Sequence, residues 1–228
     1  MTGQGSMRAS NAAALHAAER SVVELWRDLK PTYPELSAPF LVDPPLGYWE
    51  TDRLLICGQE TCGWAESLDA ESSVDSLITA LKAEYRSAEL GVRWQYTPFW
   101  RGTAKISRAL LKGVERPPFI WTNLVKCDAR RRRPPKEVEE RVATVPLLGA
   151  EMEAYAPSVV IFFTGPRYDE RLKAALPGTA LESDGRFVAR VAHPSLPAKS
   201  YRTYHPNYLS RSKNWDVLDQ LIRLCLPT

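Results

Sequence analysis

A continuous apolar run, SVVIFF at 158–163, constrains the fold of this chain more than any other segment. Pro157 and Gly165 bound the run. A short run without polar alternation is typical of a strand buried on both faces, and such a strand requires helices above and below its sheet. Shorter apolar runs predict three further strands, at 54–57, 119–121 and 187–192.

Apolar residues at helical spacing predict helices between these strands. The predicted helices are 12–29, 74–85, 103–111, 136–155, 169–175 and 215–226. Pro146 should interrupt the fourth helix, and YTPFW at 96–100 should form a loop. Strands that alternate with helices favour a parallel sheet. We therefore predict an α/β fold, a three-layer α/β/α sandwich around a mainly parallel four-stranded central sheet.

The composition is that of an ordinary globular protein, with 44% hydrophobic and 25% charged residues. The small, polar residues 1–10 predict a flexible tail, and the length of 228 residues favours a single domain over 11–228. The four cysteines have neither CxxC nor zinc-type spacing, which predicts a reduced, intracellular protein without a metal site. No apolar run approaches the roughly eighteen residues of a membrane span, so we expect no membrane contact.

Polar residues gather in three loop segments that are expected to share one rim of the sheet. They are GQETCGW at 58–64, TNLVKC at 122–127 and TYHPNYLSR at 203–211; the first two directly follow predicted strands, and the third comes about a dozen residues after one. In open α/β sheets the ligand crevice lies outside the carboxyl ends of the strands. Glu60, Asn123 and His205 would bring an acid, an amide and an imidazole together there, which predicts an active site. Each also has an ordinary interpretation: a solvated or helix-capping acid, an amide that caps a turn, and a histidine bonded to turn backbone.

Four segments of the chain resemble, in order and spacing, motifs of the uracil-DNA glycosylase superfamily. GQE at 58–60 is similar to the water-activating loop that begins GQD in one branch, and TNLVKC is similar to the TNVVKC strand end. PFWRG at 98–102 resembles the PFVG segment, and TYHPNYLSR resembles the second catalytic loop. The resemblance covers most of 54–226. It implies the fold of that superfamily and a monofunctional DNA glycosylase, which everts a pyrimidine and hydrolyses its N-glycosidic bond to leave an abasic site.

The resemblance assigns catalytic roles to an acid and a histidine. Glu60 matches the carboxylate that orients water and stabilises the oxocarbenium-like sugar. His205 matches the donor to the base oxygen as the leaving group becomes anionic. His193 is a rival, because it begins an HPS triplet directly after a predicted strand. The residues that follow His205, including Leu209 and Arg211, fit the family continuation better.

Other matched residues are assigned to the everted base. Asn123 would read a pyrimidine edge, Gln59 would contact the substrate, and Phe99 would stack on the base, although a core phenylalanine is nearly as good an interpretation. Tyr208 and Leu209 would enter the base stack as a wedge, or they merely anchor their loop.

A basic stretch lies at 126–136, where six Lys or Arg residues face a single acid, Asp128. Taken alone, such a run is as easily a solvated loop. In the context of the resemblance we expect contacts to DNA phosphates from Arg130, Arg131, Arg132, Arg133 and Arg211. DNA is therefore the expected partner of a monomeric, cytoplasmic protein associated with the nucleoid.

Two positions depart from the family pattern. Cys127 matches one ligand of an iron-sulfur cluster, but no cysteine follows it through Ala143, so we expect neither cluster nor cofactor. Cys62 stands where uracil-specific branches carry a tyrosine that excludes substituents at carbon 5 of the pyrimidine. The smaller side chain would leave room, unless Trp64 refills it, for a modified pyrimidine such as a modified cytosine of phage DNA, which would make the protein a defence enzyme.

Two other functions remain open. One is a DNA-binding protein that keeps the base-everting fold but has lost hydrolysis. The other is a hydrolase of free nucleosides, which would have little use for the arginine run.

Overall fold

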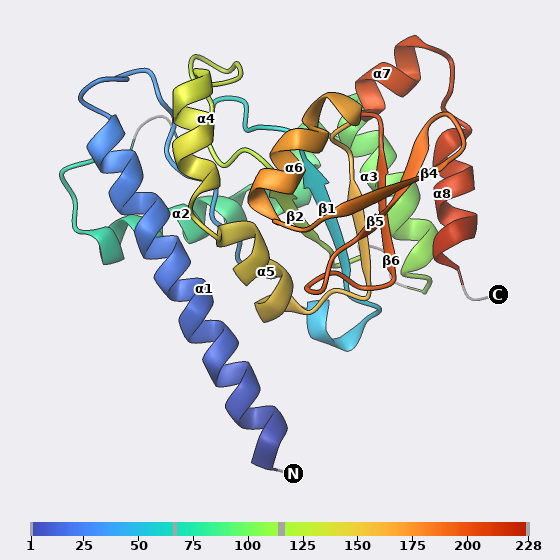
Figure 1. Cartoon of the computed structure of the whole chain (residues 1–228), viewed down its shortest axis with the longest axis horizontal. Helices are drawn as coiled ribbons and strands as arrows, with labels where there is room; N and C mark the ends of the chain where they lie inside the picture. The colour runs from blue at the N-terminus through green and yellow to red at the C-terminus, as the bar shows by residue number, and fades with distance from the viewer. Residues whose placement is uncertain (1, 66–67, 114–116, 227–228) are drawn as a thin grey trace.

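The computed structural model describes residues 2–65, 68–113 and 117–226, which form helices around a mixed six-stranded sheet (Figure 1). The strand order across the sheet is β2-β1-β3-β6-β5-β4. The strands are β1 (Leu54–Gly58), β2 (Ile120–Asn123), β3 (Val159–Phe162), β4 (Ala180–Asp184), β5 (Val188–Ala192) and β6 (Lys199–Thr203). The α/β class is as predicted.

Strand directions divide the sheet into two parts. Neighbouring strands run parallel from β2 through β1 and β3 to β6, whereas β5 is antiparallel to both β6 and β4. In register, Cys57 of β1 lies opposite Thr122 of β2 and Phe162 of β3. The ends of β1, β2, β3 and β6 therefore meet along one edge, which we call the carboxyl rim.

The prediction of a four-stranded sheet was wrong, because the sequence signal for β4 and β6 is weak. β6 has the sequence KSYRT and places polar residues, Ser200 and Thr203, at fully buried positions. β4 is an edge strand whose side chains are largely exposed, so it lacks an apolar pattern. Apolar periodicity detects strands that carry several core residues, whereas β4 packs only Leu181 and β6 only Tyr201 against the apolar clusters.

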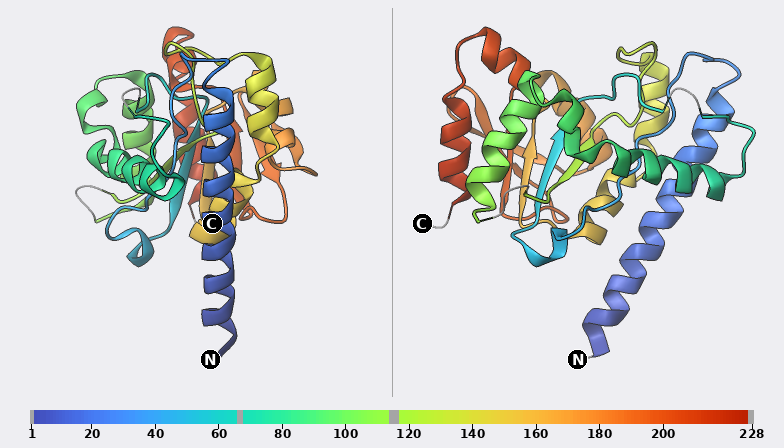
Figure 2. Two further views of the ribbon diagram at one scale, coloured as in Figure 1. Left: turned by 90° about the vertical axis from the view of Figure 1, so that its left-hand side faces the viewer. Right: turned by 180° about the vertical axis from the view of Figure 1, so that it is seen from behind.

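Helices cover both faces of the sheet (Figures 1 and 2). They are α1 (Thr2–Leu29), α2 (Val74–Ser87), α3 (Pro98–Leu110), α4 (Lys136–Ala143), α5 (Leu147–Tyr155), α6 (Asp169–Ala175), α7 (Pro206–Arg211) and α8 (Val217–Cys225). Core side chains of α1, α2, α4, α5 and α6 pack with Leu55 and Phe162 on one face. Those of α3, α7 and α8 pack with Leu54 and Ile161 on the other.

Prolines define two helix boundaries. Pro146 separates α4 from α5, as predicted. Pro98 starts α3 earlier than predicted, because its fixed φ suits the first turn of a helix, so residues 98–100 are helical rather than a loop.

The amino-terminal helix α1 extends away from the body and includes residues 2–10, for which the sequence predicts a flexible tail. None of the helices that the structure describes has the length and apolar character needed to cross a membrane.

A buried ion pair ties the segment after β2 to α5. Lys126 and Glu151 are only 3% and 1% exposed, and the Lys126 Nζ lies 2.7 Å from the Glu151 carboxylate. The Thr122 hydroxyl donates to the same carboxylate at 2.9 Å. Removing one member of such a pair leaves an uncompensated buried charge, which costs far more free energy than an exposed pair contributes.

Lys126→Met should therefore lower the free energy of unfolding by about 3–5 kcal/mol, measured by urea denaturation. The double variant Lys126→Met/Glu151→Leu should recover most of this loss, because no unpaired charge remains. Lys136→Met, at an exposed pair with Glu140, is the matched control and should change stability by less than about 0.5 kcal/mol. A single variant as stable as this control would contradict the role given to the pair.

Candidate active site

The end of β1 is covered directly by two predicted site residues. Gly58 lies opposite Asn123 in the parallel register. A Cβ atom on residue 58 would lie 2.3 Å from Asn123 Oδ1 and 3.5 Å from the Phe99 ring. Only glycine allows this approach, so the absence of a side chain at position 58 lets the amide and the aromatic ring pack over the strand end.

Asn123 presents a buried amide that is unsatisfied within the described chain. Its side chain is only 2% exposed, and Nδ2 has no hydrogen-bond partner among the described residues. An unpaired buried donor costs roughly 1–3 kcal/mol. A ligand acceptor at this position would satisfy the donor and remove that cost.

His205 stacks on Phe99, with ring centroids 5.5 Å apart and an interplanar angle of 20°. Its Nδ1 accepts a hydrogen bond from the backbone N–H of Asn207 at 3.2 Å, at the start of α7. Burial lowers the pKa of His205 to about 4, so the imidazole is neutral at neutral pH. With Nδ1 acting as the acceptor, Nε2 carries the proton and can donate it in a hydrogen bond.

The Phe99 and His205 rings are too close to admit a third ring between them. Planar groups pack roughly 3.5 Å apart, so a sandwiched base would need a separation of ~7 Å. A base that stacks on Phe99 at this position would have to displace His205 from the ring.

Glu60 is held by a residue that the sequence did not single out. The hydroxyl of Tyr168, in the turn after β3, donates a hydrogen bond to the Glu60 carboxylate. Burial raises the pKa of Glu60, while the Tyr168 hydrogen bond and the nearby Arg133 oppose the rise. The available signal was the position of Tyr168 in the short connection that follows SVVIFF, on the same rim.

Tyr168 is itself fixed by a charged cluster. The guanidinium carbons of Arg133 and Arg171 lie 4.8 and 5.2 Å from the centroid of its ring. Both arginines also pair with the buried carboxylate of Glu139, Arg133 at 2.9 Å. The cluster links the basic loop to Glu60 through the tyrosine.

The predicted substrate residue Gln59 bridges two loops of the rim. Its Nε2 donates to the carbonyl oxygen of Thr164, after β3, at 2.7 Å. The backbone N–H of Val125 donates to the Gln59 carbonyl at 2.8 Å. Gln59 thus joins the segments that follow β1, β2 and β3.

Asp128 holds the GQETCGW loop against the arginine loop. Its fully buried carboxylate accepts hydrogen bonds from the Thr61 hydroxyl at 2.7 Å and the backbone N–H of Gly63 at 2.9 Å. It also accepts from the backbone N–H of Arg131 at 2.8 Å. Arg130 and Arg131 adopt left-handed φ values of 53° and 63° in this turn. The side chains of residues 130–133 are all exposed.

The structure does not bring His193 to the site. His193 follows β5, which runs antiparallel to β6, so it lies beyond the opposite edge of the sheet. Its ring nitrogens bond with the Ser195 hydroxyl at 2.8 Å and the Pro177 carbonyl at 3.1 Å. His205 instead follows the parallel strand β6, on the carboxyl rim.

Of the two predicted wedge residues, Leu209 is fully buried in the core of α3, α7 and α8, as its alternative interpretation as a loop anchor expects. Tyr208 is exposed and stacks on Tyr204 with centroids 4.6 Å apart. Arg211 is exposed at the end of α7.

Cys62 is exposed, with its Sγ 3.7 Å from the carbonyl oxygen of Arg131. Trp64 packs in the core against Phe40, with centroids 4.5 Å apart. The Trp64 ring therefore contributes to the core on the face covered by α1, α2, α4, α5 and α6. Cys127 is buried, and burial raises the pKa of its thiol to about 12.

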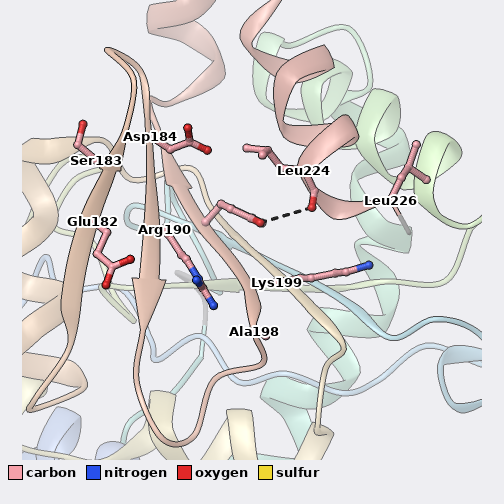
Figure 3. A pocket seen from close by; sticks show the side chains of 9 residues that line it. Glu182, Ser183, Asp184, Arg190, Ala198, Lys199, Leu224 and Leu226 are labelled. Carbon is pink, nitrogen blue, oxygen red and sulfur yellow. Dashed lines mark hydrogen bonds between the residues drawn. The ribbon is translucent and has the colours of Figure 1, made fainter. Parts of the chain in front are cut away.

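Two surface hollows lie away from these residues. One, of about 600 Å³, is lined by charged side chains of β4 to β6 and by the end of α8, including Glu182, Arg190 and Lys199 (Figure 3). The other, of about 510 Å³, lies between the end of α1 and residues 70–71. Neither is lined by Asn123 or His205. No protein-family model and no curated protein matches this chain.

The imidazole of His205 should titrate with a midpoint near pH 4, as a neutral Nε2–H tautomer above it, measured by nitrogen-15 NMR. Phe99→Ala should raise the pKa toward its ordinary value of 6.5, because it removes the ring that covers the imidazole. Tyr208→Ala, which removes an exposed ring from the same segment, should leave the titration unchanged. A wild-type midpoint at 6.5 would show that the imidazole is solvated.

Proposed function

We propose that this chain is a monofunctional DNA glycosylase of the uracil-DNA glycosylase superfamily, which removes uracil or a 5-modified pyrimidine. The single observation that carries the proposal is the amide of Asn123, buried and unpaired in the described chain, beside the ring of Phe99. An imidazole donor follows β6 and a carboxylate follows β1, two parallel strands of the same rim that are separated by β3. The run of parallel strands from β2 to β6 supports the superfamily arrangement.

Recognition of the base would use Asn123 and Phe99. An everted pyrimidine offers carbonyl oxygens on its edge and a flat face on its ring. The Asn123 Nδ2 would donate to one such oxygen, which would satisfy the buried donor. The Phe99 ring would stack on the base once His205 moves from it.

Cleavage would use His205 and Glu60. As the C1′–N bond breaks, negative charge grows on the base, and the neutral His205 can donate its Nε2–H to a base oxygen. The Glu60 carboxylate would stabilise the positive sugar and orient the water. Water adds to C1′, its proton passes to Glu60, and the departing base takes up a proton on release.

DNA would lie across the carboxyl rim. Arg130 and Arg132, exposed in the loop beside Glu60, and Arg211 at the end of α7 are the proposed phosphate contacts. Arg133 is engaged by Glu139, so its main role is to support Tyr168. The short, exposed side chain of Cys62 supports a substrate with a group at carbon 5, and therefore a role in defence against phage DNA.

Base release from end-labelled oligonucleotides, each with one modified pyrimidine, tests the proposal after alkaline cleavage of the abasic product. Glu60→Gln should slow release by roughly 10²- to 10⁴-fold, since it removes the acid–base group. His205→Ala should slow it by roughly 10²- to 10³-fold, because one fixed donor is lost. DNA binding should persist in both variants.

His193→Ala is the matched control and should release base at the wild-type rate. An inactive His193 variant beside an active His205 variant would reverse the assignment. A wild-type protein that binds DNA but releases no base from any substrate would instead support a DNA-binding protein without hydrolysis.

The rate of base release should fall as the pH drops through the pKa of Glu60, which lies above its ordinary value of 4.5. Tyr168→Phe removes a hydrogen bond that stabilises the ionised carboxylate, so the acid limb should move to higher pH. Tyr33→Phe removes an equivalent tyrosine–glutamate hydrogen bond, to Glu137, and should leave the profile unchanged. If the acid limb of the Tyr168→Phe variant lies at the same pH as that of the wild type, the group that titrates is not Glu60.

A further inference from the structure

An exposed aromatic segment leads from the surface into the candidate site. Trp94 and Tyr96, in the connection between α2 and α3, are 43% and 84% exposed. We propose that these two rings, the aromatic platform, stack on unpaired DNA bases next to the everted nucleotide. The choice of DNA as ligand rests on the proposed function.

Ring contacts connect Trp94 of the aromatic platform to the site. Trp94 stacks on Trp100 with centroids 6.4 Å apart and an interplanar angle of 20°. Trp100 packs edge to face against Phe99, with ring centroids 5.2 Å apart, and Phe99 stacks on His205. A base on the platform would therefore lie close to one that occupies the site.

The backbone before the aromatic platform is held in an unusual conformation. Glu89, Leu90 and Gly91 have consecutive positive φ values of 46°, 50° and 79°. A Cβ atom on residue 91 would lie 2.1 Å from the Trp100 ring, so the chain passes directly against that ring. Left-handed residues other than glycine persist only where the surrounding structure determines them. Trp94, which stacks on the same Trp100 ring, is thus presented in a set position, which reduces the entropy lost on binding.

The chemistry of the segment suits nucleic acid. Aromatic side chains stack on any base, because every base has a flat π face. Residues 90–105 contain no Asp or Glu, so no carboxylate of this segment repels a phosphate. Eversion of a nucleotide also leaves its neighbours unstacked, and their exposed faces require a new partner. Leu209 is buried and cannot meet this need.

Binding of fluorescently labelled single strands, measured by anisotropy, tests the platform. One probe is an oligothymidylate, and the other has the same length but carries an abasic tetrahydrofuran at every position. Tyr96→Ala should weaken binding to the first probe by roughly 5- to 150-fold, the range for loss of one base–aromatic stack. It should leave binding to the second probe unchanged, since that strand has no bases.

Two controls isolate the stacking contact. Tyr96→Phe keeps the ring and should keep the affinity. Trp49→Ala removes a tryptophan that is 50% exposed in the short helix Tyr48–Glu50, just before the amino end of β1. This segment lies at the edge of the sheet opposite the carboxyl rim (Figure 1), so the variant should bind both probes as the wild type does.

The proposal is overturned if Tyr96→Ala binds the oligothymidylate as tightly as the wild type does, or if the substitution weakens binding to both probes by the same factor. It is also overturned if the wild type binds neither probe. Base release, assayed in parallel, separates this result from the proposed function. A wild type that shows the Tyr96 effect but releases no base would sustain the platform and reject the glycosylase.

Discussion

The parallel alignment of β2, β1, β3 and β6 is the constraint on which the candidate site depends. Parallel strands end at the same edge of a sheet, so the segments that follow them must meet there. Glu60, Asn123 and His205 are distant in sequence; Glu60 and His205 follow β1 and β6, and Asn123 is the last residue of β2. The reversal of direction at β5 has the opposite effect and carries His193 away from the rim.

Buried polar groups then determine the shape of the rim. Asp128 accepts hydrogen bonds from both the GQETCGW loop and the arginine loop, so neither can shift alone. Glu139 pairs with two arginines that lie over Tyr168, and Tyr168 bonds Glu60. The carboxylates of Asp128 and Glu139 are buried, so leaving either of them unpaired would cost free energy. A phosphate that attracted Arg133 would thus compete with the contacts that support Glu60.

Sequence reasoning located the strands that an apolar core supports and the loops that follow them. It identified β1, β2, β3 and β5, and it placed the helix break at Pro146. It missed β6 because buried Ser200 and Thr203 do not produce an apolar pattern. It also placed PFW in a loop, where Pro98 in fact begins α3. Tyr168 went unrecognised because its importance comes from one contact across the rim.

The sequence alone determined the α/β class, the candidate acid, amide and imidazole, and the basic run, because periodicity and residue type are local properties. Only the tertiary structure decided which histidine shares the rim with Glu60, since that depends on strand direction. It likewise buried Leu209 and Trp64 and left Trp94 and Tyr96 exposed. Burial is a property of packing between distant segments, and no local pattern in the chain specifies which of several aromatic residues the core will take.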